Sequence, residues 1–177
     1  MTHSRGGTGH HQVAAVAGNL TKTYGSGDTE VAALRGVSVA FGAGEFTAIM
    51  GPSGSGKSTL MHCLAGLDVA TSGSVRIGEV ELTGLSDKAM TTLRRDRIGF
   101  VFQAFNLVPT LTAAENITLP LDIAGRDVDQ AWFDTVVGRL GLTDRLSHRP
   151  AELSGGKEYP EAWAPAPVRG PDIKFCE

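Results

Sequence analysis

The sequence predicts an α/β fold, and three neighbouring features carry this prediction. Residues 46–50 form a short apolar run that is typical of a buried strand. Residues 51–58 match the pattern G-x-x-x-x-G-K-[ST], and residues 57–67 favour a helix. A strand, a glycine-rich turn and a helix in this order are the usual setting of a phosphate-binding loop, or P-loop. We therefore expect the chain to bind a nucleoside triphosphate there.

The residue types in this loop suit phosphate chemistry. Glycine lets successive N–H groups converge on an anion, because no Cβ blocks the approach. Lys57 supplies a positive charge for the β- and γ-phosphates, and the Ser58 hydroxyl suits Mg²⁺. The residues expected to hold the nucleotide are Gly51, Pro52, Ser53, Gly54, Ser55, Gly56, Lys57, Ser58 and Thr59. The alternative is a glycine-rich surface loop without a ligand, and the flanking strand and helix disfavour it.

The composition indicates a globular protein with one sizeable core. The chain has 177 residues, of which 41% are hydrophobic and 20% charged, and its net charge is −3. This charge gives no support to a nucleic-acid partner. Cys63 and Cys176 lie far apart, so we expect reduced thiols in a cytosolic compartment. No apolar stretch approaches the roughly 18 residues of a membrane span. Residues 1–12 are expected to be a disordered tail, although their histidines leave loose metal binding as an alternative.

Local patterns predict the elements along the chain. Strands are expected at 13–24, 34–41, 75–77 and 98–102, with turns at 25–28 and 42–45. Ser86 suits the cap of a helix that runs to about Arg95. Thr112 and Glu115 fit a capping box at a second helix, which Pro120 should bend or end. An apolar stripe should pack in the core of a third helix that stops at Gly141; its members are Val128, Trp132, Val136, Val137 and Leu140.

Three further motifs resemble those of ABC (ATP-binding cassette) ATPases. Residues 153–156 (Leu153, Ser154, Gly155 and Gly156) look like the signature motif of that family. Gln103, at the end of a predicted strand, resembles its Q-loop glutamine, and Tyr24 resembles its A-loop aromatic residue. Each motif is weak alone, and their order and spacing make the set specific. The resemblance covers residues 12–156.

The resemblance implies a RecA-like core with an antiparallel β subdomain at 13–103 and a helical subdomain at about 104–156. Tyr24 would stack on adenine, while Ser58 and Gln103 would hold Mg²⁺. Residues 153–156 would contact the γ-phosphate bound by a second protomer in a head-to-tail homodimer. Segments such as 67–73 and 98–103 look most like the lipoprotein-release and macrolide-export type. That type works with an integral-membrane permease, so a cytoplasmic place on the inner face of the cell membrane and a role in export are implied.

The last residues, 157–177, depart from the family pattern. Residues 171–175 resemble the start of a Walker B strand, but Lys174 interrupts what should be a buried hydrophobic strand. Glu177 stands where the Mg²⁺-binding Asp is expected, and the catalytic Glu and switch His are absent from the chain. The central sheet would then be incomplete, and this polypeptide should bind ATP weakly and hydrolyse it poorly. A non-catalytic or regulatory nucleotide-binding remnant is therefore an alternative to a transport ATPase subunit. A soluble ABC protein acting on DNA or ribosomes is a weaker one.

Overall fold

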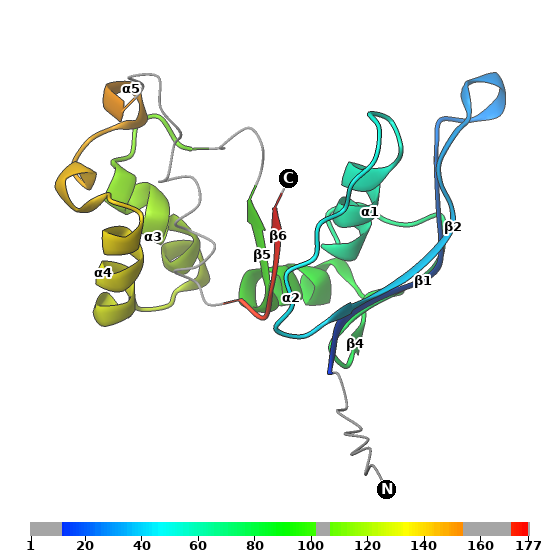
Figure 1. Cartoon of the computed structure of the whole chain (residues 1–177), viewed down its shortest axis with the longest axis horizontal. Coiled ribbons are helices and arrows are strands. Elements are labelled where there is room, and N and C mark those ends of the chain that lie inside the picture. The colour runs from blue at the N-terminus through cyan, green and yellow to red at the C-terminus, as the bar shows by residue number, and fades with distance from the viewer. Residues whose placement is uncertain (1–11, 102–106, 154–170, 177) are drawn as a thin grey trace, which may run out of the picture. The chain divides into compact units, whose positions relative to one another are not determined.

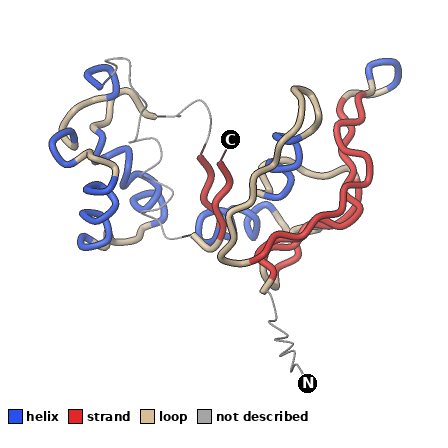
Figure 2. The backbone as a smooth tube through the Cα atoms, in the orientation of Figure 1, coloured by secondary structure: helices blue, strands red, loops and turns tan. Residues whose placement is uncertain are grey.

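The computed structural model describes residues 12–101, 107–153 and 171–176. The predictions for the N-terminal tail, for Gln103, for Ser154, Gly155 and Gly156, and for the proline-rich segment up to residue 170 lie outside these ranges. The chain divides into two compact units, residues 1–86 and residues 87–177. The first unit is mostly sheet, and the second is mostly helical with one pair of strands (Figure 2).

The first unit is built on an antiparallel sheet whose strand order is β2-β1-β3-β4. Its strands are β1 (Val13–Tyr24), β2 (Val31–Gly42), β3 (Ser72–Ile77) and β4 (Val80–Glu81). The 3-10 turn η1 (Gly27–Thr29) joins β1 to β2, and these two strands run side by side as a long ribbon (Figure 1). The structure confirms the strands predicted at 13–24, 34–41 and 75–77.

The core of this unit lies between the sheet and helix α1 (Lys57–Leu64). Ala15 and Ala17 are buried on β1, two residues apart and therefore on one face of the strand. They pair with Ile77 and Val75 of β3, which are also buried. The buried side chains of α1 are Leu60, Cys63 and Leu64. This packing fixes the helix whose first turn follows the predicted phosphate-binding loop.

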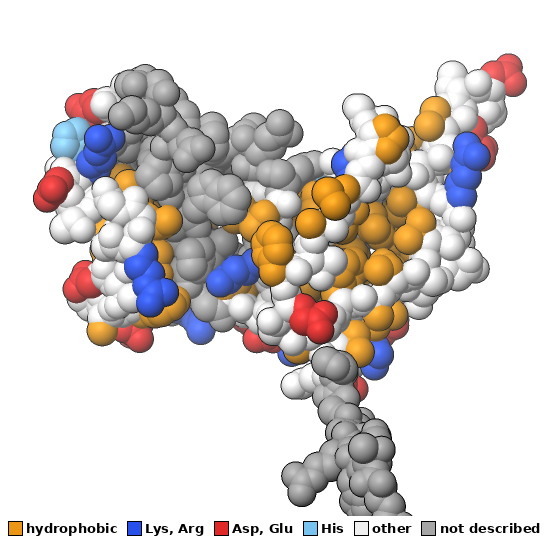
Figure 3. Space-filling model, viewed as in Figure 1, with side chains coloured by type: hydrophobic (Ala, Val, Ile, Leu, Met, Phe, Trp, Pro, Cys, Tyr) orange, Lys and Arg blue, Asp and Glu red, His pale blue; other side chains and the backbone are white. Residues whose placement is uncertain are grey.

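The strand predicted at 46–50 is absent from the first unit. Residues 45–50 have no regular structure, and Phe46 and Met50 are 97% and 88% exposed. Hydrophobic side chains are visible on the surface of this unit in Figure 3. An apolar run favours burial, but a strand also needs a neighbour to pair with. Among residues 12–101, 107–153 and 171–176, none pairs with this run.

The second unit begins with helix α2 (Asp87–Arg97), which leads directly into β5 (Ile98–Val101). β5 pairs in parallel with β6 (Ile173–Cys176), and Arg97 forms an ion pair with Asp172 at the start of this pairing. The helix predicted after Ser86 and the strand predicted from residue 98 are confirmed as far as the structure describes them. Lys174 does not interrupt β6: alternation leaves it exposed while Phe175 is buried, with its ring 6.2 Å from that of Phe100.

The rest of the second unit is helical. Its elements are α3 (Ala113–Ala124), α4 (Gln130–Arg139), the 3-10 turn η2 (Thr143–Arg145) and α5 (Pro150–Leu153). Their buried core consists of Ile117, Leu121, Phe133, Val136, Val137 and Leu142. The predicted core position of Trp132 is wrong, because this side chain is 41% exposed and Phe133 takes its place. Asp129 caps α4, so Val128 precedes the helix and helical spacing cannot be counted from it.

Helix α3 continues through Pro120 to Ala124, so the prediction that this proline could end the helix is wrong. Proline inside a helix costs about 3 kcal/mol. The buried neighbours Ile117 and Leu121 each contribute about 1.5–3 kcal/mol, which offsets that cost. The capping box of Thr112 and Glu115 is confirmed, with both of its hydrogen bonds present. Gly141 follows α4 in the left-handed region at φ 68°, as a helix stop requires.

Candidate nucleotide site

The predicted phosphate-binding loop is an exposed turn that ends at the N-terminus of α1. Residues 51–55 are exposed, so the loop is accessible to a ligand. Gly54 and Gly56 have φ values of 78° and 86°, which side-chain-bearing residues rarely adopt. Gly56 is also the N-cap of α1, and its carbonyl accepts the N–H of Leu60 at 2.8 Å. The first turn of α1 therefore directs backbone N–H groups toward the loop, as an anion site requires.

Gly56 holds this loop against strand β2. A Cβ placed on Gly56 would lie 2.5 Å from the carbonyl oxygen of Ala33, which is too close for any side chain. The glycine at this motif position thus permits a close approach of two backbones. A loop fixed in this way keeps its N–H groups in place for phosphate oxygens, so the residues present fit a nucleotide.

Lys57 carries the positive charge of the site. Its ammonium donates hydrogen bonds to the carbonyl oxygens of Gly51 and Pro52 at 2.9 and 2.7 Å. These contacts hold the charge against the start of the loop, where it would meet the phosphates of a bound nucleotide.

The described donor for Mg²⁺ is the exposed hydroxyl of Ser58, in the first turn of α1. Its predicted partner Gln103 lies outside the described ranges. Within those ranges, no group of three or more His, Cys, Asp or Glu side chains is arranged to hold a metal ion. A hydroxyl together with nucleotide phosphates is the usual environment of Mg²⁺ at such loops.

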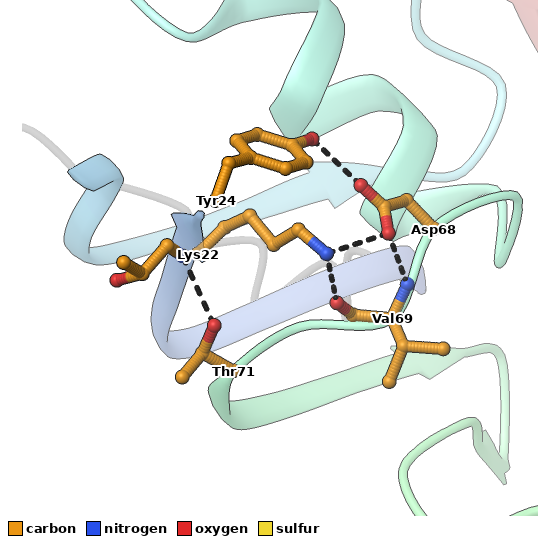
Figure 4. Close-up of polar contacts among 6 residues, drawn as sticks. Lys22, Tyr24, Asp68, Val69 and Thr71 are labelled. Carbon is orange, nitrogen blue, oxygen red and sulfur yellow. Dashed lines mark hydrogen bonds and ion pairs between the residues drawn. The ribbon is translucent and has the colours of Figure 1, made fainter. Parts of the chain in front are cut away.

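Tyr24 lies at the end of β1 and is 42% exposed. Its hydroxyl donates a hydrogen bond of 2.6 Å to Asp68, in the segment that follows α1 (Figure 4). Lys22, two residues earlier on the same face of β1, lies over the tyrosine ring with its Nζ 4.7 Å from the ring centroid. The predicted adenine-stacking residue is therefore held by two neighbours that the sequence analysis did not identify.

Asp68 is the centre of this arrangement. It forms a 2.6 Å ion pair with Lys22 and accepts the N–H of Val69 at 2.7 Å. Burial alone would raise the pKa of Asp68, but the hydrogen bonds from Lys22, Tyr24 and Val69 outweigh it and hold the pKa below its usual value. The hydrogen bond to Asp68 raises the pKa of Lys22 and of Tyr24. The two-residue spacing of Lys22 and Tyr24 was the signal that sequence reasoning could have used.

The start of the predicted signature lies at the end of α5, where Leu153 is its last residue. The N–H groups of Ala113 and Ala114, at the N-terminus of α3, donate to the carbonyls of His148 and Leu146 at 2.8 and 3.0 Å. These bonds fix the segment that leads into α5 against a longer helix. They give the signature region a rigid approach within the second unit.

Comparisons with known proteins agree with this geometry. The chain matches the ABC transporter family over residues 34–175. It is 46% identical over 161 residues to the lipoprotein-releasing system ATP-binding protein LolD of Geobacter metallireducens, covering 90% of this chain and 72% of that protein. It is 42% identical to the macrolide export ATP-binding/permease protein MacB of Bdellovibrio bacteriovorus, covering 89% of this chain and 24% of that protein.

A solved structure is also similar. It is a dimeric, post-hydrolysis form of the ATP-binding cassette MJ0796 bound to ADP and Pi, with a TM-score of 0.82 and 39% identity. The match covers 92% of this chain and 72% of that one. In the part of the chain that the structure describes, no helix is long and apolar enough to cross a membrane. The loop geometry, the family match and the similar fold agree, and the chain belongs to the ABC transporter family as an ATP-binding cassette.

Proposed function

We propose that residues 51–59 bind MgATP and that this binding drives transport by a membrane partner. The observation that carries the proposal is the P-loop itself, with Gly56 pressed against Ala33 and the Lys57 ammonium held at the start of the loop. Backbone N–H groups, a cation and the Ser58 hydroxyl together match the β- and γ-phosphates and their Mg²⁺. Mg²⁺, when bound, would neutralise part of the phosphate charge.

Further residues complete the proposed site. Tyr24 stacks on the adenine ring, because an exposed aromatic face suits a flat base. Gln103 joins Ser58 at Mg²⁺ and carries the state of the nucleotide to the permease. Leu153, Ser154, Gly155 and Gly156 contact the γ-phosphate held by a second copy of the chain, which makes the working form a head-to-tail homodimer.

The names of the relatives support a role in export. LolD is the ATP-binding protein of a lipoprotein-releasing system, and MacB is a macrolide export protein that combines ATP-binding and permease parts. By the same logic, this chain works on the inner face of the cell membrane beside an integral-membrane permease. ATP closes two protomers on each other, and hydrolysis to ADP and phosphate releases them.

A binding experiment tests the nucleotide site. Calorimetric titration of the full chain with MgATP should show saturable binding, and Lys57→Met should weaken it about ten-fold or more, because a charge-assisted contact is lost. Lys88→Met is the matched control, since Lys88 is exposed on α2, and it should bind as the unchanged chain does. Equal affinity of the Lys57→Met variant and the unchanged chain would contradict the proposal.

A further inference from the structure

One face of the Tyr24 ring is already covered. The Lys22 ammonium lies over the ring at 4.7 Å from its centroid, so it occupies one of the two aromatic faces. The side chain is nevertheless 42% exposed, which leaves aromatic surface for another partner. A cation behind the ring draws π-electron density toward itself. The other face then becomes less negative, and this favours the stacking of an electron-rich purine.

The position of the ring is also fixed. Its hydroxyl is tethered to Asp68 at 2.6 Å, and Asp68 is held by Lys22 and by the N–H of Val69. Lys22 additionally donates to the carbonyl oxygen of Val69 at 2.7 Å. A ring bound at its hydroxyl and covered on one face cannot turn freely about its side-chain bonds.

The ion pair in this network is shielded from water. The side chains of Lys22 and Asp68 are only 12% and 28% exposed. Ion pairs that are fully exposed contribute little, because solvent and salt screen them. A partly buried pair with two further hydrogen bonds on its carboxylate is held more firmly.

The tether connects Tyr24 to the P-loop helix. Asp68 lies 44 residues after Tyr24, just beyond α1, and the amide groups of Leu67 and Asp68 both donate to the carbonyl of His62 on that helix. The same helix begins with Lys57 and Ser58. The distance between the ring and the phosphate-binding loop is therefore fixed through Asp68.

We propose that Asp68 and Lys22 are positioning residues for the nucleobase: they hold Tyr24 with one face covered by the ammonium and the other facing the adenine of a nucleotide whose phosphates lie in the P-loop. This inference rests on the proposed nucleotide site and adds to it. Neither residue touches the phosphates. Their contribution acts on the base alone, through the tyrosine ring.

The competing interpretation is that the network only fastens β1 to the segment after α1. The two interpretations differ in which ligands they affect. A positioning role weakens only ligands that carry a base. A fastening role alters the loop as a whole and weakens every phosphate ligand. Inorganic tripolyphosphate has the phosphates of ATP without its base, so it separates the two.

The experiment compares MgATP and magnesium tripolyphosphate by calorimetric titration of the full chain. Asp68→Ala should raise the Kd for MgATP about five- to ten-fold, which corresponds to about 1–1.4 kcal/mol. The Kd for tripolyphosphate should stay within about two-fold. Glu79→Ala is the matched control, because this carboxylate is exposed in the turn between β3 and β4, and neither Kd should change.

Two further variants keep the test decisive if Asp68→Ala fails to fold. Tyr24→Phe keeps the ring and removes only its tether, so it should raise the Kd for MgATP and leave that for tripolyphosphate unchanged. Lys22→Met keeps the aliphatic stem and removes the cation behind the ring, with the same expected pattern. Asp68→Ala combined with Tyr24→Phe should be no weaker than either alone, because both remove one interaction.

The outcomes separate the two proposals. Failure of the unchanged chain to bind either ligand overturns the nucleotide site itself. Binding of both ligands, with variants that weaken both equally or neither, overturns the positioning role and leaves the site standing. Selective loss of MgATP affinity supports both.

Discussion

Gly54 and Gly56 share a left-handed backbone but differ in their surroundings. Gly54 has open space where a Cβ would lie, whereas a Cβ on Gly56 would meet the carbonyl oxygen of Ala33 at 2.5 Å. Gly54→Ala should therefore cost about 1 kcal/mol from backbone strain alone. Gly56→Ala should cost about 2–4 kcal/mol, because strand β2 or the loop must also move. Urea unfolding of both variants checks this, and equal losses would show that the close approach is unimportant.

The pKa of Asp68 predicts how the tether responds to acid. Because this pKa is held below its ordinary 3.8 in the folded chain, the ionised carboxylate stabilises the fold above that value. This stability is lost as the pH falls through the folded-state pKa. The contributions of Lys22 and Tyr24, whose pKa values are raised, are present at neutral pH and lost only in strong alkali.

Asp68→Asn isolates this effect, because it keeps the shape of the side chain and removes its charge. The difference in unfolding free energy between the unchanged chain and this variant should be constant from about pH 5 to about pH 9 and shrink below about pH 4. Unfolding curves measured across this range test the prediction. A difference that grows toward low pH would contradict the assigned direction of the pKa.

At the scale of elements, Asn116 fixes the segment before α3. It is 5% exposed, and its amide donates to the carbonyls of Val108, Leu111 and Thr112 while its oxygen accepts the N–H of Val108. Asn116→Leu leaves these backbone groups without their partner and should cost about 2–4 kcal/mol. Thermal or urea unfolding measures it. Asp122→Asn, exposed on the same helix, should change stability by no more than about 0.5 kcal/mol.

The elements that the sequence predicted correctly depend on neighbouring residues. The capping box of Thr112 needs only Glu115, and the half-buried strand at 34–41 shows its alternation directly. The failures depend on distant partners. Residues 46–50 are apolar, yet no alternation or propensity says which strand would pair with them. Trp132 was assigned to the core by counting from Val128, which precedes the helix.

The candidate site divides in the same way. The P-loop is a contiguous motif, so its residues could be predicted from their order alone. The tether from Tyr24 to Asp68 spans 44 residues and depends on how β1 and the end of α1 pack. Tertiary contacts of this kind leave no local pattern in one sequence. The spacing of Lys22 and Tyr24 indicated a shared strand face but gave no sign of the carboxylate between them.

For the whole molecule, the account predicts self-association that depends on nucleotide. Sedimentation velocity of the full chain should show a shift from monomer toward dimer as MgATP is added. Ser154→Glu should abolish this shift and leave MgATP affinity unchanged, because it places a negative charge against the γ-phosphate held by the other copy. A dimer that forms equally without nucleotide, or that survives Ser154→Glu, would contradict the head-to-tail arrangement.

The central claim is that MgATP binds at the P-loop, and chemical-shift mapping tests it most directly. Backbone amide signals of the ¹⁵N-labelled full chain would be recorded while MgATP is added. The account predicts the largest shifts at residues 51–59, a smaller shift at Tyr24, and little change at Thr112 and Glu115, whose capping box lies in the second unit. Shifts confined to other residues, with the signals of Gly54, Gly56 and Lys57 unmoved, would show that nucleotide does not bind at this loop.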